Sequence, residues 1–409
     1  MESARLIAGL VRMVRDVALA EDLAQDALVA ALQQWPESGV PGNPGAWLMT
    51  IAKRRAVDLF RRNERLERKQ SELERELGGE SFMPNFDAAL DDYIEDDLLR
   101  LMFICCHPVL SREARAALTL RLLAGLSTQE IARAFLTADA TIGQRISRSK
   151  RALARARVPF EEPTAEERAE RLSSVLDVVY LLFNEGYSAT AGEDWLRPAL
   201  CDEALRLGRV LATLTPGEPD VLGLLALMQL QASRSAARTG PSGEPILLLD
   251  QDRSRWDRFL IRRGLEALER AESLSASPGT YVLQAAIAAC HARAPASTDT
   301  DWTRIAGLYA ALVRVEPSPI VELNRAVAVS MADGPAAGLC VLDAVADSPT
   351  LAAYHLLPSV RGDLLAKLGR HDEATSEFER AASLTRNERE RALLLSRAAR
   401  PAPDVRGPS

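Results

Sequence analysis

The chain is poor in the residues that most often build metal sites and disulfide frameworks. It has four histidines, scattered singly, and five cysteines among its 409 residues. An odd number of irregularly spaced cysteines predicts no disulfide framework. Cys105, Cys106 and His107 form a possible metal or redox cluster, but adjacent side chains on a helix point about 100° apart and no fourth ligand is nearby. We therefore expect no metal and no cofactor, and we expect these cysteines to be packed in a core.

Motifs of catalysis and long apolar runs are missing as well. The chain has no phosphate-binding Gly-Lys-Ser/Thr motif, no metal-spaced histidine pair and no nucleophile elbow, so we expect no enzyme. The alternative is a catalytic C-terminal domain whose polar groups converge on a pocket: Asn184, Glu185, Asp250, Asp252, Arg253 and His291. No apolar run approaches the roughly 20 residues of a membrane span, and the N-terminus lacks the features of a signal peptide. The sequence predicts a cytoplasmic protein without membrane contact.

Aromatic residues are sparse, and the charge is unevenly distributed. Aromatics make up 5% of the chain while Ala, Leu, Arg and Glu dominate, a mixture that favours helix and predicts an all-α fold. The net charge is −7, yet two basic segments, 53–69 and 141–157, flank an acidic segment, 72–97. Nucleic-acid binding depends on where the charge lies rather than on its sum. The two basic segments are therefore candidate DNA-binding surfaces.

Residues 4–35 are expected to form two helices that separate near Arg15 and Asp16. The second helix has a stripe of Leu and Ala residues at helical spacing. Three polar residues lie on the opposite face: Asp22, Gln25 and Asp26. Pro36 and the following Gly39-Val40-Pro41 are expected to break the chain.

The next helix begins with a clear capping signal. Asn43 is expected as its N-cap and Pro44 as its first residue, and the helix should run to about Arg62. Its polar face presents Trp47 together with Thr50, Arg54, Asp58 and Arg61. The candidate DNA contacts on this helix are Trp47, Thr50, Lys53, Arg54, Arg55, Arg61 and Arg62. A stacking ring beside phosphate partners is what single-stranded DNA binding requires. A tryptophan at the edge of a core is the alternative.

A helix-turn-helix pattern follows the acidic segment. A helix at 112–123 ends near Gly125, and a capping box from Ser127 to Glu130 starts a short second helix. After a turn at 136–140, which contains no glycine, a third helix opens at Thr141. Three of its apolar residues are expected to face inward: Ile142, Ile146 and Leu153. The outer face carries the candidate DNA contacts: Thr141, Gln144, Arg145, Arg148 and Arg151. Arg and Gln suit contacts to guanine and adenine edges in the major groove.

The remainder of the chain is predicted to be helical, with ten candidate helices between residues 168 and 384. Two parts of it, 320–345 and 359–384, each pair two helices around a small-residue turn. Ala337 and Ala374 occupy matching positions in the two pairs. This pattern is typical of tetratricopeptide repeats, whose helix pairs stack into a solenoid.

Residues 1–157 resemble the extracytoplasmic-function group of sigma-70 sigma factors. Residues 16–32 resemble the second conserved region, 43–62 the segment that opens and reads the −10 element, and 118–153 the fourth region, which reads the −35 element. The resemblance implies binding of core RNA polymerase, through its beta and beta-prime subunits, by Asp22, Gln25 and Asp26. It also implies −10 contacts from the Trp47 face and −35 contacts from the Arg145 face. Many relatives have Asn at the position of Arg54, where it helps to capture a flipped base, so base choice at −10 stays open.

The C-terminal part resembles the extension of one large subgroup, which is helical and tetratricopeptide-like. The resemblance rests on four stretches: 183–187, 223–228, 250–256 and 284–289. We expect sigma region 2 at 1–70, an acidic linker at 71–97, sigma region 4 at 98–157 and a regulatory extension at 158–409. The linker is either a solvated tether or, by resemblance, a mimic of RNA phosphates near the RNA exit path.

Partners and regulation follow from this organisation. We expect core polymerase and promoter DNA as partners, and an extension that contacts the sigma regions or polymerase and sets activity. The competing hypothesis is a helix-turn-helix regulator with a ligand- or protein-sensing helical domain that does not bind core polymerase. That hypothesis leaves the Asp22 face and the Trp47 helix without a role.

Overall fold

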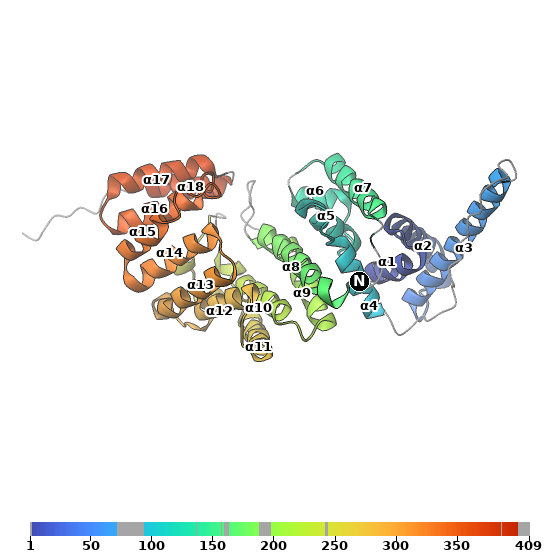
Figure 1. Ribbon diagram of the computed structural model, residues 1–409, viewed down its shortest axis with the longest axis horizontal. Coiled ribbons are helices and arrows are strands. Elements are labelled where there is room, and N and C mark those ends of the chain that lie inside the picture. Colours follow the sequence, from blue (N-terminus) through green and yellow to red (C-terminus); the bar gives the residue numbers. More distant parts are fainter. Residues whose placement is uncertain are drawn as a thin grey trace, which may run out of the picture. The chain divides into compact units, whose positions relative to one another are not determined.

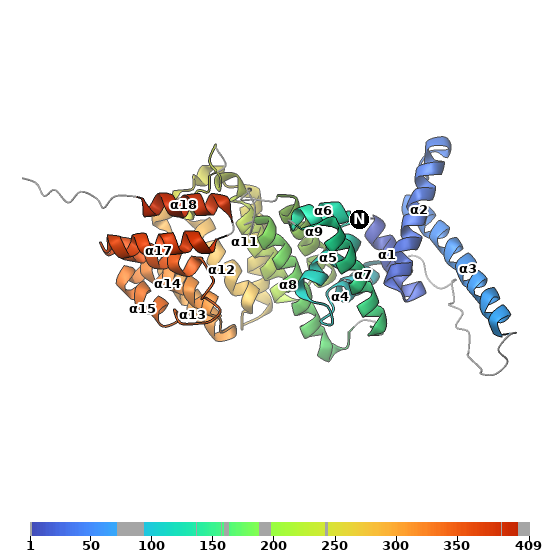
Figure 2. The same ribbon diagram turned by 90° about the horizontal axis from the view of Figure 1, so that it is seen from above.

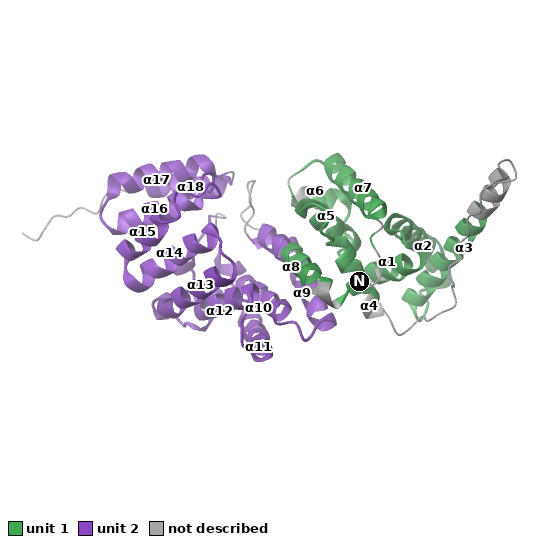
Figure 3. Cartoon of the chain, viewed as in Figure 1, with its two compact units in different colours: residues 1–179 green, residues 180–409 purple. Residues whose placement is uncertain are grey.

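The computed structural model is helical throughout the part of the chain that it describes (Figure 1). It describes residues 2–71, 94–135, 137–156, 158, 163–187, 198–241, 244–385 and 387–399. These residues form α-helices and short 3-10 helices and no β-sheet, which confirms the all-α prediction. The chain divides into two compact units, residues 1–179 and 180–409 (Figure 3). No described helix is long and apolar enough to cross a membrane.

The first unit contains seven complete helices of the described chain and the beginning of an eighth. They are α1 (Glu2–Val14), α2 (Val17–Ser38), α3 (Pro44–Ser71), α4 (Ile94–Cys105), α5 (Arg112–Leu122), α6 (Thr128–Ala134), α7 (Asp139–Arg155) and α8 (Ala165–Tyr187). Helix α8 starts in the first unit and ends in the second.

The break between α1 and α2 lies where the sequence predicts it. Arg15 has a left-handed φ of 53°, and the Asp16 carboxylate caps α2 by accepting from the Leu19 amide at 2.8 Å. The predicted break at Pro36 is wrong. Helix α2 continues through Pro36 and ends at Gly39, whose φ of 80° stops it. This last turn is exposed, so water can satisfy the carbonyl that lacks a donor because proline has no N–H.

The start of α3 also agrees with the sequence, whereas its end does not. The Asn43 side chain accepts from the Ala46 amide at 3.1 Å and caps the helix. The helix then runs to Ser71 rather than ending near Arg62. Most of the expected acidic linker, 72–93, lies outside the described residues. Its last four residues, 94–97, lie in the first turn of α4.

Helix α4 forms the centre of the first unit and packs against α1 and α5. Nearly every described side chain on it is buried, including Cys105, and Cys106 just after it is buried as well. Burial raises the pKa of Cys106 to about 12 and also raises that of Cys105. Both cysteines are therefore buried in the core, as the packing prediction expects.

The second unit is built from helices that pack mainly against their neighbours in sequence (Figure 2). Its α-helices are α9 (Pro198–Leu214), α10 (Pro219–Ala232), α11 (Arg258–Leu274), α12 (Thr280–Arg293), α13 (Trp302–Val315), α14 (Pro319–Asp333), α15 (Pro335–Asp343), α16 (Leu356–Lys367), α17 (His371–Leu384) and α18 (Glu388–Ala398). Short 3-10 helices are η1 (Ser235–Ala237), η2 (Leu248–Asp250), η3 (Arg253–Arg255) and η4 (Ser297–Asp299).

Both helix pairs expected near the C-terminus are present. Helix α14 packs on α15, and α16 packs on α17. Gly334 and Gly369 take positive φ values of 98° and 78° at the two turns, a conformation that glycine adopts without strain.

Candidate functional site

Helices α6 and α7 have the geometry of a helix-turn-helix. The Ser127 hydroxyl accepts from the Glu130 amide at 3.2 Å, and the Glu130 carboxylate accepts from the Ser127 amide at 2.8 Å. This reciprocal capping box fixes the start of α6, as predicted. Helix α7 begins at Asp139, two residues before the predicted start at Thr141. Leu136 in the turn lies outside the described residues.

The two faces of α7 divide as the sequence predicts. Ile142, Ile146 and Leu153 are buried. Four candidate DNA contacts are exposed: Thr141, Gln144, Arg148 and Arg151. Arg145 is half-buried. Ser149 is buried, which was not predicted, and its hydroxyl donates to the Arg145 carbonyl at 2.7 Å. The helix thus offers one amide and three guanidinium groups on a single side.

The candidate −10 helix, α3, carries a pair of tryptophans rather than one isolated ring. Trp47 packs against Trp35 of α2 with ring centroids 5.4 Å apart and a tilt of 58° between the rings. Trp35 was missed because it precedes Pro36, where a helix end was expected. Its indole nitrogen is buried and has no hydrogen-bond partner among the described residues. The two rings support one another. Trp47 therefore lies at the edge of the core, and its side chain is half-exposed.

The cations of α3 lie along the same helix. Four of the predicted contacts are exposed: Thr50, Arg54, Arg61 and Arg62. Lys53 and Arg55 are half-buried. The Arg55 guanidinium makes an ion pair with Asp26 of α2 at 3.2 Å. The structure therefore links a residue predicted to bind polymerase with one predicted to bind the −10 element.

The α2 face predicted to bind polymerase is exposed. Asp22, Gln25 and Asp26 all lie on the surface. Val29 and Leu32, one turn further along, are also exposed, at 48% and 77%. A polar face that continues into uncovered apolar side chains is typical of a protein-binding surface.

Glu21, next to this face, is buried and joins three helices of the first unit. Its side chain accepts from the Arg121 Nε of α5 at 2.7 Å, pairs with Lys150 of α7, and accepts from the Gln25 amide at 2.9 Å. This cluster was not predicted from the sequence. Helical spacing places Glu21 on the stripe of Val17 and Ala24, so a carboxylate at an apolar position was the available signal.

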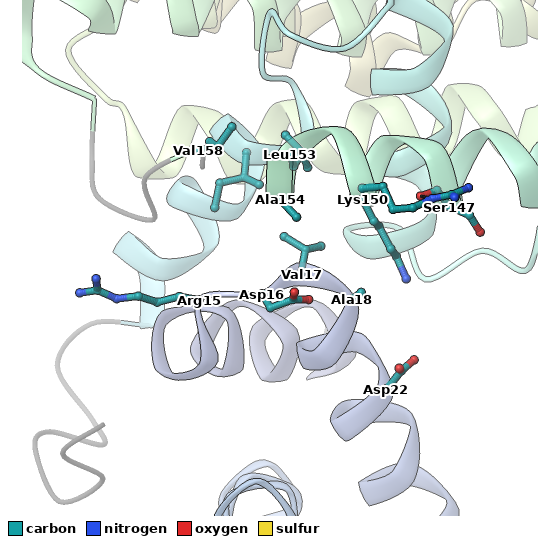
Figure 4. A pocket seen from close by; sticks show the side chains of 12 residues that line it. Arg15, Asp16, Val17, Ala18, Asp22, Ser147, Lys150, Leu153, Ala154 and Val158 are labelled. Carbon is teal, nitrogen blue, oxygen red and sulfur yellow. Dashed lines mark hydrogen bonds between the residues drawn. The ribbon is translucent and has the colours of Figure 1, made fainter. Parts of the chain in front are cut away.

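A pocket of about 340 Å³ lies between α2 and α7, beside Glu21 (Figure 4). In the figure Val17 points toward Ala154, and Lys150 reaches from α7 toward α2. Asp22 and Arg151 both line this pocket. A residue predicted to bind polymerase and one predicted to bind DNA are thus neighbours. A macromolecular partner that contacts both inside the pocket must separate the two helices, because the pocket is only large enough for a small molecule.

The beginning of α8 belongs to the packing of the first unit. Ser174 is buried, accepts from the Arg115 guanidinium of α5 at 2.8 Å, and donates to the Cys106 carbonyl at 2.5 Å. Ser174 lies in the expected extension, 158–409, yet its contacts belong to the core around α4 and α5.

Several residues considered for a catalytic alternative make structural contacts in the described structure. Arg253 and His291 meet, but Arg253 donates to the His291 carbonyl at 2.6 Å, which is a structural contact. Asp250 and Asp252 are exposed, and the Asp252 carboxylate accepts from the Ser254 amide at 2.9 Å as a helix cap. These contacts hold the backbone in place and create no acid–base pair.

Comparisons with known proteins match three segments of the chain. Sigma-70 region 2 matches residues 2–66, Sigma-70 region 4 matches 100–153, and a family of unknown function (DUF6596) matches 171–272. An uncharacterized protein of Rhizobium meliloti (strain 1021) is 43% identical over 397 residues, which cover 94% of this chain and 90% of that protein.

Two characterised groups of relatives match the N-terminal third. ECF RNA polymerase sigma factor SigK of Mycobacterium sp. (strain KMS) is 32% identical over 139 residues, or 33% of this chain and 68% of SigK. ECF RNA polymerase sigma factor SigL of Mycobacterium tuberculosis (strain ATCC 25618 / H37Rv) is 29% identical over 143 residues, or 35% of this chain and 76% of SigL.

Proposed function

This chain belongs to the ECF RNA polymerase sigma factors of the sigma-70 family, and we propose that it directs core polymerase to a specific set of promoters under the control of its C-terminal extension. Sigma factors are not enzymes, so its action is binding rather than catalysis. Regions 2 and 4 imply binding of core RNA polymerase and promoter DNA. A protein with these partners is expected in the cytoplasm.

One observation carries the proposal most directly. Helix α7, inside the segment that matches region 4, buries its apolar residues and exposes Gln144, Arg148 and Arg151. In our proposal this side enters the major groove of the −35 element, with Thr141 near the helix start and Arg145 as an anchor. Bidentate contacts from these side chains would select guanine and adenine.

For the −10 element we propose that Trp47 stacks on an unpaired base while the cations of α3 hold the phosphates. The proposed phosphate partners are Thr50, Lys53, Arg54, Arg55, Arg61 and Arg62. Contact with Trp35 supports this role, because it holds the Trp47 ring in place before DNA arrives. Base stacking on an aromatic ring contributes about 1–3 kcal/mol, enough to offset much of the free energy of unstacking.

For core polymerase we propose a contact between its beta and beta-prime subunits and Asp22, Gln25 and Asp26. The exposed Val29 and Leu32 extend this surface with apolar area, which a stable interface requires. The carboxylates would then give orientation and association rate more than affinity.

For the domain organisation we propose region 2 at 1–70, a linker at 71–97, region 4 at 98–157 and a tetratricopeptide-like solenoid at 158–409 that contacts the sigma regions or polymerase. Sequential packing of the helices in the second unit supports the solenoid.

Charge reversal on α2 tests the proposal. Asp22→Lys in the full chain should abolish co-purification with core polymerase and promoter-dependent transcription, with helicity unchanged by circular dichroism. Asp22 is the cleaner position, because Asp26→Lys also places a cation against Arg55. Asp202→Lys on the exposed surface of α9 is the matched control. Unchanged core binding by Asp22→Lys would favour a DNA-binding regulator that does not use polymerase.

A deletion of the extension tests its regulatory role. Removing 164–409 would also remove Ser174 from the region 4 core, so the deletion should begin after Tyr187, the end of α8. Transcript yield should change several-fold, because a tethered domain acts at roughly millimolar effective concentration. Equal yields and equal core affinity with and without 188–409 would leave the extension without this role.

A further inference from the structure

Arginines and aromatic rings lie close together near the C-terminal ends of α8 and α10. We call this group the arginine–aromatic cluster: Tyr187, Arg234, Arg238, Arg253, Trp256 and His291. The Arg238 and Arg234 guanidinium carbons lie 3.6 and 5.9 Å from the Tyr187 ring centroid. Those of Arg253 and Arg234 lie 4.8 and 5.8 Å from the Trp256 ring centroid. Arg234 is therefore the guanidinium that neighbours both rings.

Two of the three arginines already hold backbone groups in place. Arg238 donates to the Tyr187 carbonyl at the end of α8. Arg253 donates to the His291 and Ala294 carbonyls, each at 2.6 Å, and so closes the end of α12. Arg234 differs from both. Its half-exposed guanidinium has no hydrogen bond or ion pair to any described residue.

Further donors of the cluster are buried without an acceptor. The Nε of Arg253 and the Nε1 of Trp256 have no hydrogen-bond partner among the described residues, and these side chains are 7% and 3% exposed. His291 Nδ1, on a residue that is 8% exposed, is also unpartnered. Buried polar groups normally have a partner. Here the unpartnered groups of the arginines and Trp256 are all donors, so the missing partner is an acceptor.

The electrostatics of the cluster agree with a missing negative charge. Burial and then the charge of Arg234 lower the pKa of Arg253, with Asp299 partly offsetting them. Burial, followed by Arg234 and Arg253, lowers the pKa of His291 to about 4. The imidazole is therefore neutral at pH 7. Positive charges held this close repel one another, and a bound anion would remove that repulsion.

We propose that the arginine–aromatic cluster binds a small anion that carries a carboxylate or phosphate group, with Arg234 as its main contact. A guanidinium presents a planar fork that donates two parallel hydrogen bonds to either group. The Tyr187 and Trp256 ring centroids lie 5.9 and 5.8 Å from the Arg234 guanidinium, and both rings help to hold it in place. The site lies mainly in the segment that matches a family of unknown function, and it contains none of the residues proposed to contact polymerase or DNA.

Isothermal titration calorimetry on the full chain at low ionic strength tests the proposal without polymerase. The probes are benzoate, phenyl phosphate and inorganic phosphate, with benzyl alcohol as the neutral comparison. At least one anion should bind saturably while benzyl alcohol does not, and comparing benzoate with the two phosphates identifies the preferred group. Arg234→Gln should lower the affinity for the anion by about tenfold or more, as expected for a lost charge-assisted hydrogen bond.

The chain provides a matched control in Arg262, an exposed arginine of α11 that lies 5.7 Å from the Phe259 ring centroid. Arg262→Gln removes the same charge from a similar cation–aromatic pair and should leave anion binding unchanged. If Arg234→Gln loses its circular dichroism signal, Arg234→Lys replaces it and should weaken binding to an intermediate degree. The proposal is overturned if no anion binds, if benzyl alcohol binds equally, or if both glutamine variants weaken binding alike.

Discussion

Replacing Glu21 by glutamine should loosen the contact between α2 and α7. The carboxylate is 4% exposed and pairs with Arg121 and Lys150 of two other helices. Glutamine keeps the shape and one acceptor oxygen but removes the negative charge. The two cations would then lie against each other around a neutral amide.

The expected loss is about 3 kcal/mol. Removing one partner of a buried ion pair costs about 3–5 kcal/mol, because the other charge stays desolvated. The lower end applies here for two reasons. Arg121 and Lys150 are 25% and 17% exposed, so both keep part of their hydration. Glutamine can also still accept a hydrogen bond from Arg121.

Hydrogen exchange measured by mass spectrometry reports this change helix by helix. A loss of about 3 kcal/mol in local opening should speed exchange in α2 and α7 by about a hundredfold. Glu203→Gln is the control, because Glu203 pairs with Arg206 within α9 and joins no second helix. That variant should change the local free energy by less than about 1 kcal/mol. Adding Lys150→Met to Glu21→Gln should recover part of the protection, since it removes one uncompensated cation.

The reasoning fails if Glu21→Gln changes protection in α2 and α7 no more than Glu203→Gln changes it in α9. A core-binding titration provides a second readout. Asp22, Gln25 and Asp26 are exposed while α2 and α7 are in contact, so a looser contact should not weaken the binding of core polymerase. Weaker core binding by a correctly folded variant would contradict this part of the argument.

Three further predictions follow from single sites. Alanine at Arg145 and Arg148 should each weaken −35 binding by about 1–3 kcal/mol and relax selection at one base pair, as read by promoter-variant binding. Iodoacetamide at pH 8 should modify the exposed Cys340 before the other cysteines, as measured by peptide mass spectrometry. Burial raises the pKa of Cys106 to about 12 and also raises the pKa values of the other three buried thiols. The pKa of His291 is lowered to about 4 from 6.5, first by burial and then by two neighbouring arginines, so the unfolded chain binds the proton first. Stability should therefore fall by up to about 3 kcal/mol as pH drops from 6.5 to 4, and His291→Gln should flatten that fall in denaturation series.

Local rules predicted those features whose causes lie within a few residues. Asn43 caps α3, and Ser127 and Glu130 cap α6 reciprocally, because each acceptor is three residues from the amide it satisfies. The inward and outward faces of α7 followed from helical spacing alone. Helix ends were less predictable, since α2 passes through Pro36 and α3 continues to Ser71.

Ion pairs between residues far apart in the sequence could not be predicted from the sequence pattern. Asp97 was counted in the acidic linker, but it is buried and pairs with Arg12 at 3.4 Å and Arg100 at 3.0 Å. Glu21 and Arg121 are 100 residues apart in the chain. Helical periodicity relates only positions on one helix and cannot connect residues so far apart. These contacts depend instead on how the helices of the first unit pack together. A buried carboxylate at an apolar helical position is the signal that such a contact leaves in a sequence.

Helix α8 changes how the extension is understood. Its first half contacts the core of the first unit, and its last residue belongs to the arginine–aromatic cluster. Ser174 in its first half contacts α4 and α5 of the first unit, and Tyr187 at its end belongs to the arginine–aromatic cluster. Thirteen residues separate them, which is about 20 Å along a helix axis. Residues 165–179, expected in the extension, therefore belong to the first unit, and a truncation that tests the extension should leave them in place.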